Sequence, residues 1–329
     1  MVAKRTRNTL LLILAGILLS VLGVFAGTFY VHRQEESCYQ QHNLLNSGVV
    51  CGNPPVLNKS GYAGLRDDLE KYINQKRADG HVERVSVYFR DLHNGPVLGI
   101  NELEAFAPAS LLKLPLAMIY LKGAEAQPGL LSHQLRYVGN TTVDLQNFKP
   151  TQSAKPGQPY PIEELLRMMI SYSDNASFET LNQYMTSDAR RNAILLQELQ
   201  ELGIIAPEDR LDEVVSTRRY SSLFRILYNV SYLDEELSKK MLTWLTSSDF
   251  NQGLESGVPQ DIKIAHKFGE RFADDSDLKQ LHDCGIVYYP DNPYLLCIMT
   301  KGDDWGELST VIATISEMTH KEVDSRRLP

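Results

Sequence analysis

Strand patterns lie at both ends of the main part of this chain, and a long helical block separates them. Apolar and polar residues alternate over residues 85–90, a His-Asn-Gly turn follows, and a second strand pattern runs to about Asn101. Strand patterns return at 261–268 and in a hairpin over 285–300. Because strands need hydrogen-bonded neighbours, we expect the two groups to form one antiparallel sheet.

Helical periodicity dominates residues 110–229, between the two strand groups. One apolar face is formed by Ile162, Leu165, Leu166, Met169 and Ile170, which repeat with the spacing of an amphipathic helix. Further helices are predicted near 65–80 and 308–315. The pattern therefore predicts an α/β protein of the α+β kind, with helices on the faces of an antiparallel sheet and an inserted all-helical lobe. A cleft between the lobes is the natural place for a site.

An uncharged, mostly apolar run of 23 residues, Thr9–Val31, stands near the N-terminus. As a helix it is long enough to cross about 30 Å of hydrocarbon. Three basic residues precede it and two acidic residues follow it, which predicts a single-pass anchor with a cytoplasmic N-terminus and an extracytoplasmic remainder. A cleaved signal peptide is the alternative, because Val24-Phe25-Ala26 suits a small-residue cleavage site.

The chain divides into four parts on the anchor interpretation. Residues 1–31 are the basic tip and transmembrane anchor, 32–60 a polar stalk, 61–322 the main domain and 323–329 a charged tail. Three of the 33 basic residues precede the apolar run, so the remainder carries 30 basic against 41 acidic residues. Such an acidic surface repels a phosphate backbone, and we expect no nucleic acid partner.

Four cysteines stand in the part predicted to be extracytoplasmic, where disulfides persist. Cys284 and Cys297 flank the turn of the predicted hairpin symmetrically, so the two strands would place them directly opposite one another. Cys38 and Cys51 would then close a small loop near the membrane. For the hairpin pair, two buried free thiols are the alternative.

A serine and a lysine three residues apart begin the helical block. Residues i and i+3 share a helix face, so Lys113 can reach the hydroxyl of Ser110. Burial among leucines lowers a lysine pKa and lets the amine act as a base, and backbone N–H groups at a helix start favour a serine nucleophile. The same spacing recurs at Ser276 and Lys279, where a charged stretch indicates a solvated loop.

Two later elements extend this pattern. The hydroxyl and carboxamide of Ser173-Asp174-Asn175 stand two residues apart on a short turn, so both can point to one site. An isolated tripeptide of this kind is also typical of helix caps. Lys267 projects from the strand face opposite Ile262 and Ile264, and Gly269 would let a substrate approach the strand edge. The eight histidines are scattered and form no ligand cluster, so we expect no metal and no cofactor.

In this order, Ser-x-x-Lys, Ser-Asp-Asn and Lys-x-Gly resemble the penicillin-recognising serine enzymes, which include class A β-lactamases and penicillin-binding D,D-peptidases. The likeness covers about residues 64–320. It implies a five-stranded antiparallel sheet flanked by helices and joined to an all-helical lobe. It also implies that a β-lactam or a peptidoglycan-like peptide is the ligand.

The resemblance implies four catalytic residues. Ser110 would attack an amide carbonyl and form an acyl-enzyme, and Lys113 would accept the proton of Ser110. Ser173 would pass a proton to the leaving nitrogen, and Lys267 would supply positive charge.

Four further residues would bind the substrate on the same resemblance. Asn175 would hold the side-chain amide of the substrate, and Phe268 and Gly269 would border it. The backbone N–H groups of Ser110 and Glu270 would form the oxyanion hole.

The sequence departs from the family pattern at two points. The family usually has Ser or Thr at the position of Phe268, where the hydroxyl binds the substrate carboxylate. Class A β-lactamases also carry a Glu-x-x-Leu-Asn pentapeptide whose Glu activates the deacylating water, and no such pentapeptide occurs between Asn175 and Lys267. The acidic stretch at 207–213 stands in its place. The sequence is therefore compatible with three functions: a β-lactamase, a D,D-peptidase-like enzyme with slow deacylation, and a catalytically idle relative that binds cell-wall peptides or a partner.

Overall fold

The computed structural model describes residues 41–51, 61–93, 95–139, 146–204, 214–272, 277–290 and 292–326, together with Gly23, Phe25, Gly27 and Cys38. Most of the predicted anchor at 9–31 and of the predicted stalk at 32–60 lies outside these residues, as does the acidic stretch at 207–213. Within the described part of the chain, no helix is both long and apolar enough to cross a bilayer.

The chain divides into two units, residues 1–54 and 55–329. In the first unit, Cys38 and Cys51 form the predicted disulfide, with their Cα atoms 6.1 Å apart. The short helix α2 (Ser47–Val50) begins after Asn46, whose side chain accepts a hydrogen bond from the Gly48 N–H at 3.0 Å. This side-chain cap satisfies an N–H group that a helix start leaves unpaired.

Five antiparallel strands of the second unit form one sheet in the order β2-β1-β7-β6-β5. Their bounds are β1 (Val82–Asp91), β2 (Val97–Ile100), β5 (Ile264–Phe272), β6 (Lys279–Val287) and β7 (Tyr294–Gly302). The strands from the two ends of the chain meet where β1 pairs with β7, with Val87 opposite Ile298. This confirms the prediction of one sheet assembled across a helical insertion.

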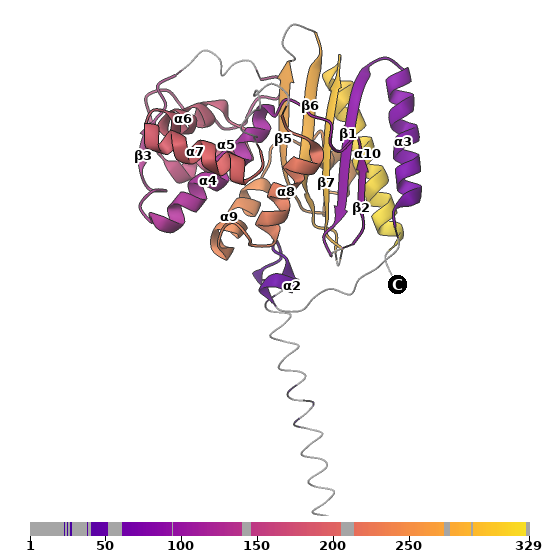
Figure 1. Cartoon of the computed structure of the whole chain (residues 1–329), viewed down its shortest axis with the longest axis horizontal. Helices are drawn as coiled ribbons and strands as arrows, with labels where there is room; N and C mark the ends of the chain where they lie inside the picture. Colours follow the sequence, from indigo (N-terminus) through magenta and orange to yellow (C-terminus); the bar gives the residue numbers. More distant parts are fainter. Residues whose placement is uncertain are drawn as a thin grey trace, which may run out of the picture. The chain divides into compact units, whose positions relative to one another are not determined.

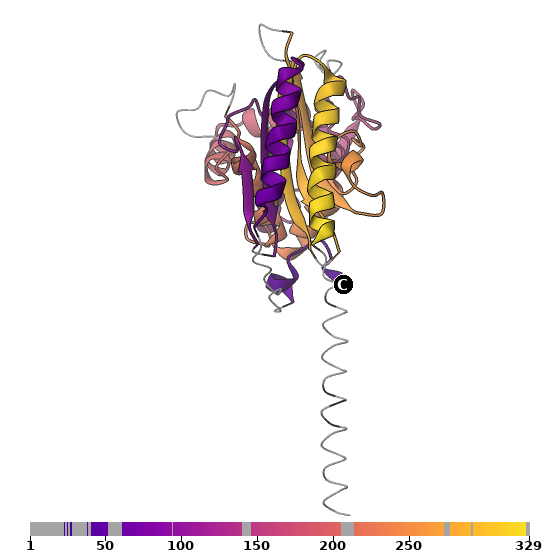
Figure 2. The same cartoon turned by 90° about the vertical axis from the view of Figure 1, so that its right-hand side faces the viewer.

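Two long helices cover one face of the sheet. Helices α3 (Ala63–Ala78) and α10 (Trp305–Ser325) lie side by side on that face, as Figures 1 and 2 show. The apolar residues of α3 recur every three or four positions, and Leu65, Leu69 and Ile73 are buried. Burying each such side chain contributes about 2 kcal/mol, so this face carries the main core.

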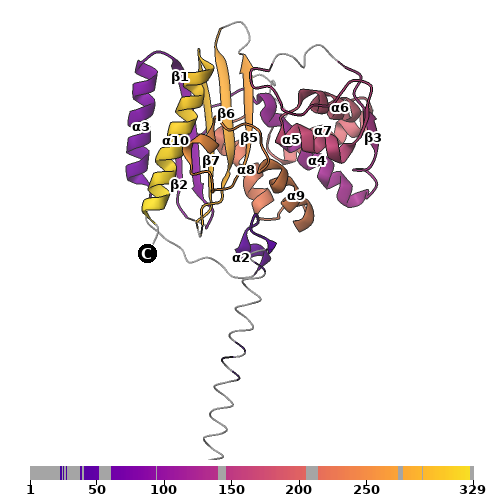
Figure 3. The same cartoon turned by 180° about the vertical axis from the view of Figure 1, so that it is seen from behind.

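The helical lobe and helix α8 lie on the opposite face, seen from behind in Figure 3. The helices on this side are α4 (Lys113–Ala126), α5 (Ile162–Ser171), α6 (Asn175–Thr186), α7 (Ala189–Glu201), α8 (Thr217–Tyr228) and α9 (Glu235–Leu245). A small two-stranded sheet of β3 (Gln134–Arg136) and β4 (Pro159–Pro161) accompanies them. Helix α8 packs directly on β7 and β6. Because both faces are covered, the central strands are buried throughout.

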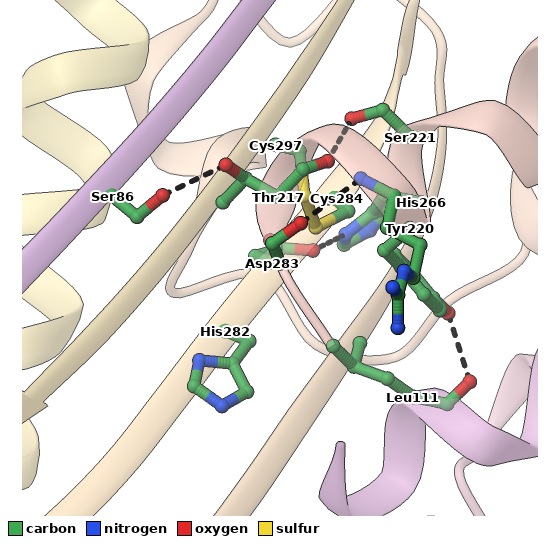
Figure 4. Close-up of a disulfide and its surroundings, with 12 residues drawn as sticks. Ser86, Leu111, Thr217, Tyr220, Ser221, His266, His282, Asp283, Cys284 and Cys297 are labelled. Atoms are coloured by element: carbon green, nitrogen blue, oxygen red, sulfur yellow. Dashed lines mark hydrogen bonds and ion pairs between the residues drawn. A yellow bond between two sulfur atoms is a disulfide. The ribbon is translucent and has the colours of Figure 1, made fainter. Parts of the chain in front are cut away.

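The predicted hairpin disulfide is present in the sheet. Cys284 on β6 and Cys297 on β7 are register partners, and their Cα atoms lie 3.9 Å apart. Lys267 on β5 is the register partner of Cys284. Directly opposite residues share a sheet face, so the disulfide lies beside Lys267 on the face that carries α8 (Figure 4).

Candidate active site

Ser110 and Lys113 lie at the start of α4, as the spacing predicts. A single 3₁₀ turn, η1 (Ala109–Leu112), precedes the helix and carries Ser110. The side chain of Lys113 is 1% exposed, whereas Ser110 is half-buried. Ala109, just before the serine, has a left-handed backbone with φ of 48°, a conformation that is unfavourable for residues with a Cβ and is often found at functional sites.

Strand β5 holds this turn in place through a close approach at Gly269. A Cβ atom at Gly269 would lie 3.0 Å from Leu111 Cγ, 3.2 Å from the Leu111 nitrogen and 3.3 Å from the Pro108 oxygen, so a larger residue would require the Ser110 turn to shift by a few tenths of an ångström. The Tyr220 hydroxyl on α8 donates to the Leu111 carbonyl oxygen at 3.0 Å (Figure 4). The glycine thus serves the packing of the Ser110 turn against the strand.

The Ser173-Asp174-Asn175 turn is fixed by the carboxylate of Asp174. Ser173 has φ of 53° and is fully buried. Asp174 caps α6 by accepting from the Ala176 and Ser177 N–H groups at 3.2 and 2.9 Å. It also accepts from the Ser153 hydroxyl, the Ala154 N–H and the Ser177 hydroxyl. The tripeptide therefore caps α6, as such a sequence typically does, and the cap holds Ser173 in a left-handed conformation.

Two buried ammonium groups converge on Ser173. Lys113 Nζ donates to the Ser173 carbonyl oxygen at 2.5 Å, to Asn175 Oδ1 at 2.7 Å and to Ser173 Oγ at 3.2 Å. Lys267 Nζ donates to the same Ser173 Oγ at 2.8 Å. In the described part of the chain, Ser110 Oγ has no hydrogen bond, so Lys113 turns to the Ser173 turn rather than to Ser110. Catalytic hydrogen bonds often tighten only when substrate binds.

Burial changes the acidity of both lysines. Desolvation is the largest cause that holds the pKa of Lys113 well below its usual 10.5, and the nearby Lys267 lowers it further. Desolvation also lowers the pKa of Lys267 to about 7. A lysine amine that loses its proton near neutral pH can accept a proton from a neighbouring hydroxyl.

We expect the protein to become more stable as the pH rises above 7. The pKa of Lys267 is about 7 in the folded protein, whereas its ordinary value, expected in the unfolded chain, is 10.5. Between these values the unfolded chain binds a proton that the folded chain does not, so the free energy of unfolding rises with pH. The lowered pKa of Lys113 acts in the same direction. Urea unfolding from pH 7 to about pH 9.5, below tyrosine ionisation, should show this rise, and Lys267→Met should flatten it. A profile that falls with pH would contradict the assignment of lowered lysine pKa values.

The ring of Phe268 packs into the core instead of facing solvent. It is 2% exposed and stacks on Phe250 with ring centroids 4.2 Å apart. Phe268 thus has almost no side-chain surface for a ligand, although its carbonyl oxygen accepts from Lys267 Nζ at 2.9 Å. Lys267 Nζ lies 4.4 Å from the centroid of the Phe268 ring, so the buried ring borders the ammonium that donates to Ser173.

Glu270 holds a second segment against the site through its side chain. Its carboxylate accepts from the backbone N–H groups of Asn147 and Phe148 at 3.1 and 3.0 Å. Desolvation raises the pKa of Glu270, and these two hydrogen bonds oppose the rise. The family resemblance implies a role only for the backbone N–H of Glu270, in the oxyanion hole.

Gln146 is a site residue that sequence reasoning missed. Its side chain is 9% exposed and donates to the Ser173 carbonyl oxygen at 3.2 Å, while none of the described residues donates to its own Oε1. No local pattern marks this glutamine, because its contact spans 27 residues. His266 on β5 is 2% exposed, and its Nδ1 lies 2.8 Å from Asp283 Oδ1 (Figure 4).

The structure thus brings Lys113, Ser173, Asn175 and Lys267 into one hydrogen-bonded group, with Ser110 on the adjoining turn. Phe268 and Gly269 are next to this group through β5, one with its ring in the core and the other packed on the Ser110 turn. Two basic groups, two hydroxyls and a carboxamide in this arrangement are suited to proton transfer around a serine nucleophile.

Comparison with known proteins agrees with this arrangement. The extended-spectrum beta-lactamase PER-1 of Pseudomonas aeruginosa is 25% identical over 251 residues, which cover 72% of this chain and 79% of that protein. The solved structure of PBP-A matches with a TM-score of 0.65 at 21% identity, covering 83% of this chain and 99% of that chain. A PBP-A variant in acyl-enzyme complex with penicillin G matches with a TM-score of 0.64 at the same identity, covering 83% of this chain and 100% of that chain.

The two structural matches show the fold, and a match to a family model shows the family from the sequence. The model of the beta-lactamase enzyme family matches residues 65–323, a span that begins in α3, ends in α10 and contains all three motifs. The order of the motifs, the five-stranded sheet with its helical lobe and this match lead to one conclusion: the chain belongs to the beta-lactamase enzyme family.

Proposed function

We propose that this chain is a membrane-anchored serine hydrolase that forms an acyl-enzyme at Ser110 with a β-lactam or a related amide. The observation that carries the proposal is the pair of buried lysines on one serine hydroxyl, with Lys113 Nζ and Lys267 Nζ at 3.2 and 2.8 Å from Ser173 Oγ. Burying two ammonium groups together is costly. A purely structural role would not need two buried amines beside one hydroxyl, because apolar side chains of similar size would pack there without this penalty.

The proposed reaction uses each group once in acylation. Ser110 Oγ attacks the amide carbonyl as neutral Lys113 accepts its proton, and the N–H groups of Ser110 and Glu270 stabilise the oxyanion. The carbon–nitrogen bond then breaks as Ser173 gives its hydroxyl proton to the leaving nitrogen and takes up the proton that Lys113 holds, across the 3.2 Å between Lys113 Nζ and Ser173 Oγ. Water later attacks the ester, which releases the acid and restores the Ser110 hydroxyl. Lys267 attracts an anionic group of the substrate while it is protonated.

Within this function, slow deacylation is favoured over rapid β-lactam turnover. The Glu-x-x-Leu-Asn pentapeptide of class A β-lactamases is absent from the sequence between Asn175 and Lys267. A peptidoglycan-like peptide would be the natural substrate of such a D,D-peptidase-like enzyme. The fold match to PBP-A, a variant of which forms an acyl-enzyme with penicillin G, supports the same choice.

The core position of Phe268 favours one other candidate, an idle relative that binds cell-wall peptides or a partner. Its ring replaces the hydroxyl with which the family binds a carboxylate, and that ring is buried. Retention of Ser110, Lys113, Ser173 and Lys267 argues for the enzyme.

We also propose that residues 9–31 anchor the chain with its N-terminus in the cytoplasm and the hydrolase domain outside. The charge pattern around this run supports the orientation. All four cysteines are paired, in Cys38–Cys51 and Cys284–Cys297, as expected of a protein that folds in an oxidising compartment.

One experiment tests both proposals. Cells that express the full chain are treated with penicillin G linked to a membrane-impermeant dye, and the protein is then isolated for intact mass. We expect a lasting adduct on the parent and none on Ser110→Ala. Ring-opened product without an adduct would indicate a β-lactamase with another deacylating base. An adduct that forms only after lysis would overturn the proposed orientation. If neither adduct nor product is detected, the catalytically idle relative is the remaining candidate.

A further inference from the structure

A cavity of about 600 Å³ lies away from the proposed catalytic group and is lined by four arginines. It is bounded by α8, by β1 and β7 and by the chain after β2, and its arginines are Arg90, Arg218, Arg219 and Arg225. Ser110, Lys113, Ser173 and Lys267 do not line it. We call it the arginine pocket.

Helix α8 contributes a single polar face to the arginine pocket. Arg218, Ser221, Ser222 and Arg225 line it, and their spacing of i, i+3, i+4 and i+7 places them on one side of a helix. Tyr88 and Arg90 line it from β1, two positions apart on the same face of the strand. Guanidinium groups therefore reach the space from two different elements.

The charge of the arginine pocket is not balanced by the residues that form it. None of the described residues that line it is acidic, although the whole chain has a net charge of -8. Arg90, Arg218 and Arg225 make no ion pair with any described residue. Elsewhere, arginines such as Arg66 and Arg167 pair with glutamates at 3.1 and 2.7 Å. Like charges gathered without counter-charges raise the local potential and attract an anion.

The backbone at the start of α8 is already occupied. The Arg218 N–H donates to the Glu102 carbonyl oxygen at 3.1 Å, and the Arg219 N–H donates to the Ser216 hydroxyl at 3.3 Å. The hydroxyls of Ser221 and Ser222 donate to the carbonyl oxygens of Thr217 and Arg219 at 2.6 and 2.7 Å. A ligand would therefore be recognised by the guanidinium groups. The helix dipole adds a favourable field for negative charge at this end.

We propose that the arginine pocket binds a small anion that carries two or more phosphate groups. Guanidinium groups bind phosphate oxygens in pairs, and three such groups that form no ion pair with the described residues suit a ligand with several negative charges. The volume lies within the range of ligand sites in proteins. The phosphates belong either to a soluble polyphosphate ester or to a lipid headgroup, and the experiment separates these sources.

Isothermal titration of the full-length protein tests the proposal with two probes. Inorganic tripolyphosphate represents the soluble source, and dibutanoyl phosphatidylinositol 4-phosphate, whose headgroup region carries two phosphates, represents the lipid source below its micelle concentration. The pocket variant is Arg218→Gln with Arg225→Gln, both of which are exposed in the parent. The matched control is Arg77→Gln with Arg190→Gln, two exposed helix arginines that do not line the pocket and give the same change in net charge.

We expect at least one probe to bind the parent and the control equally, and the pocket variant to bind it about tenfold or more weakly, as loss of charged hydrogen bonds predicts. Preference for tripolyphosphate would assign a soluble ligand, and preference for the lipid would assign a headgroup. The proposal is overturned if neither probe binds, or if both variants lose affinity alike, because the effect would then reflect net charge. Equal melting temperatures of the two variants verify that folding is not the cause.

Discussion

Replacing Lys113 with methionine is expected to slow acylation of Ser110 by about 10³-fold, within the range that a general base contributes. Methionine keeps the length and packing of a side chain that is 1% exposed, and it removes the amine that would accept the serine proton. The measurement is the rate of penicillin adduct formation, followed by rapid mixing and intact mass.

The matched control for this substitution lies on the same helix. Lys122 is more exposed, and its ammonium forms an ion pair with Glu125 at 2.5 Å. Lys122→Met should leave the acylation rate close to that of the parent. Lys113→Met also removes the donor to the Ser173 carbonyl oxygen and Asn175 Oδ1, so the melting temperature is measured to verify that the variant folds. Acylation at the parental rate in this folded variant would show that the base is another group.

Replacing Asp174 with alanine is expected to destabilise the protein by about 3 kcal/mol. The carboxylate accepts five hydrogen bonds, from the Ala176 and Ser177 N–H groups of α6, the Ser177 hydroxyl, the Ser153 hydroxyl and the Ala154 N–H. Loss of an N-cap costs about 1 kcal/mol, and buried donors left unpaired cost about 1–3 kcal/mol more. Urea unfolding measures this loss directly.

Acylation should fall together with stability in the Asp174 variant, because Ser173 keeps its left-handed φ of 53° only while the turn is held. Asp188 provides the comparison, since it caps α7 by accepting from the Arg190 and Arg191 N–H groups. Asp188→Ala should lower the melting temperature less and leave acylation unchanged. If both variants lose the same stability and neither loses activity, Asp174 is only a helix cap.

Much of the fold could be predicted because its signals are local. Alternation over residues 85–90 predicted β1, the symmetric cysteines predicted the pairing of β6 with β7, and the apolar face at 162–170 predicted α5. The motif order predicted which residues would meet, and Lys113, Ser173 and Lys267 do so. For the strands and helices, neighbouring residues carry the information, since strand and helix periods repeat within a few positions. The meeting of the motif residues was implied by the resemblance to the family.

The site details depend on contacts between distant parts of the chain, and these were not predicted. The spacing of Ser110 and Lys113 allows a hydrogen bond, yet Lys113 Nζ bonds to a turn 60 residues away. Gly269 was expected to admit substrate, and the structure uses it to seat the Ser110 turn. No periodic pattern encodes either choice, because each depends on how β5 and the helical lobe pack together.

The sequence by itself determined the order of the strands and helices and the set of residues available for chemistry, and it placed the four cysteines where two disulfides could form. The tertiary structure alone decided that Phe268 enters the core, that Glu270 clasps residues 147–148 and that four arginines surround one cavity. The physical reason is that periodicity and spacing are properties of neighbouring residues. Burial, desolvation and the partner of each charged group depend on elements that meet only after the chain has folded.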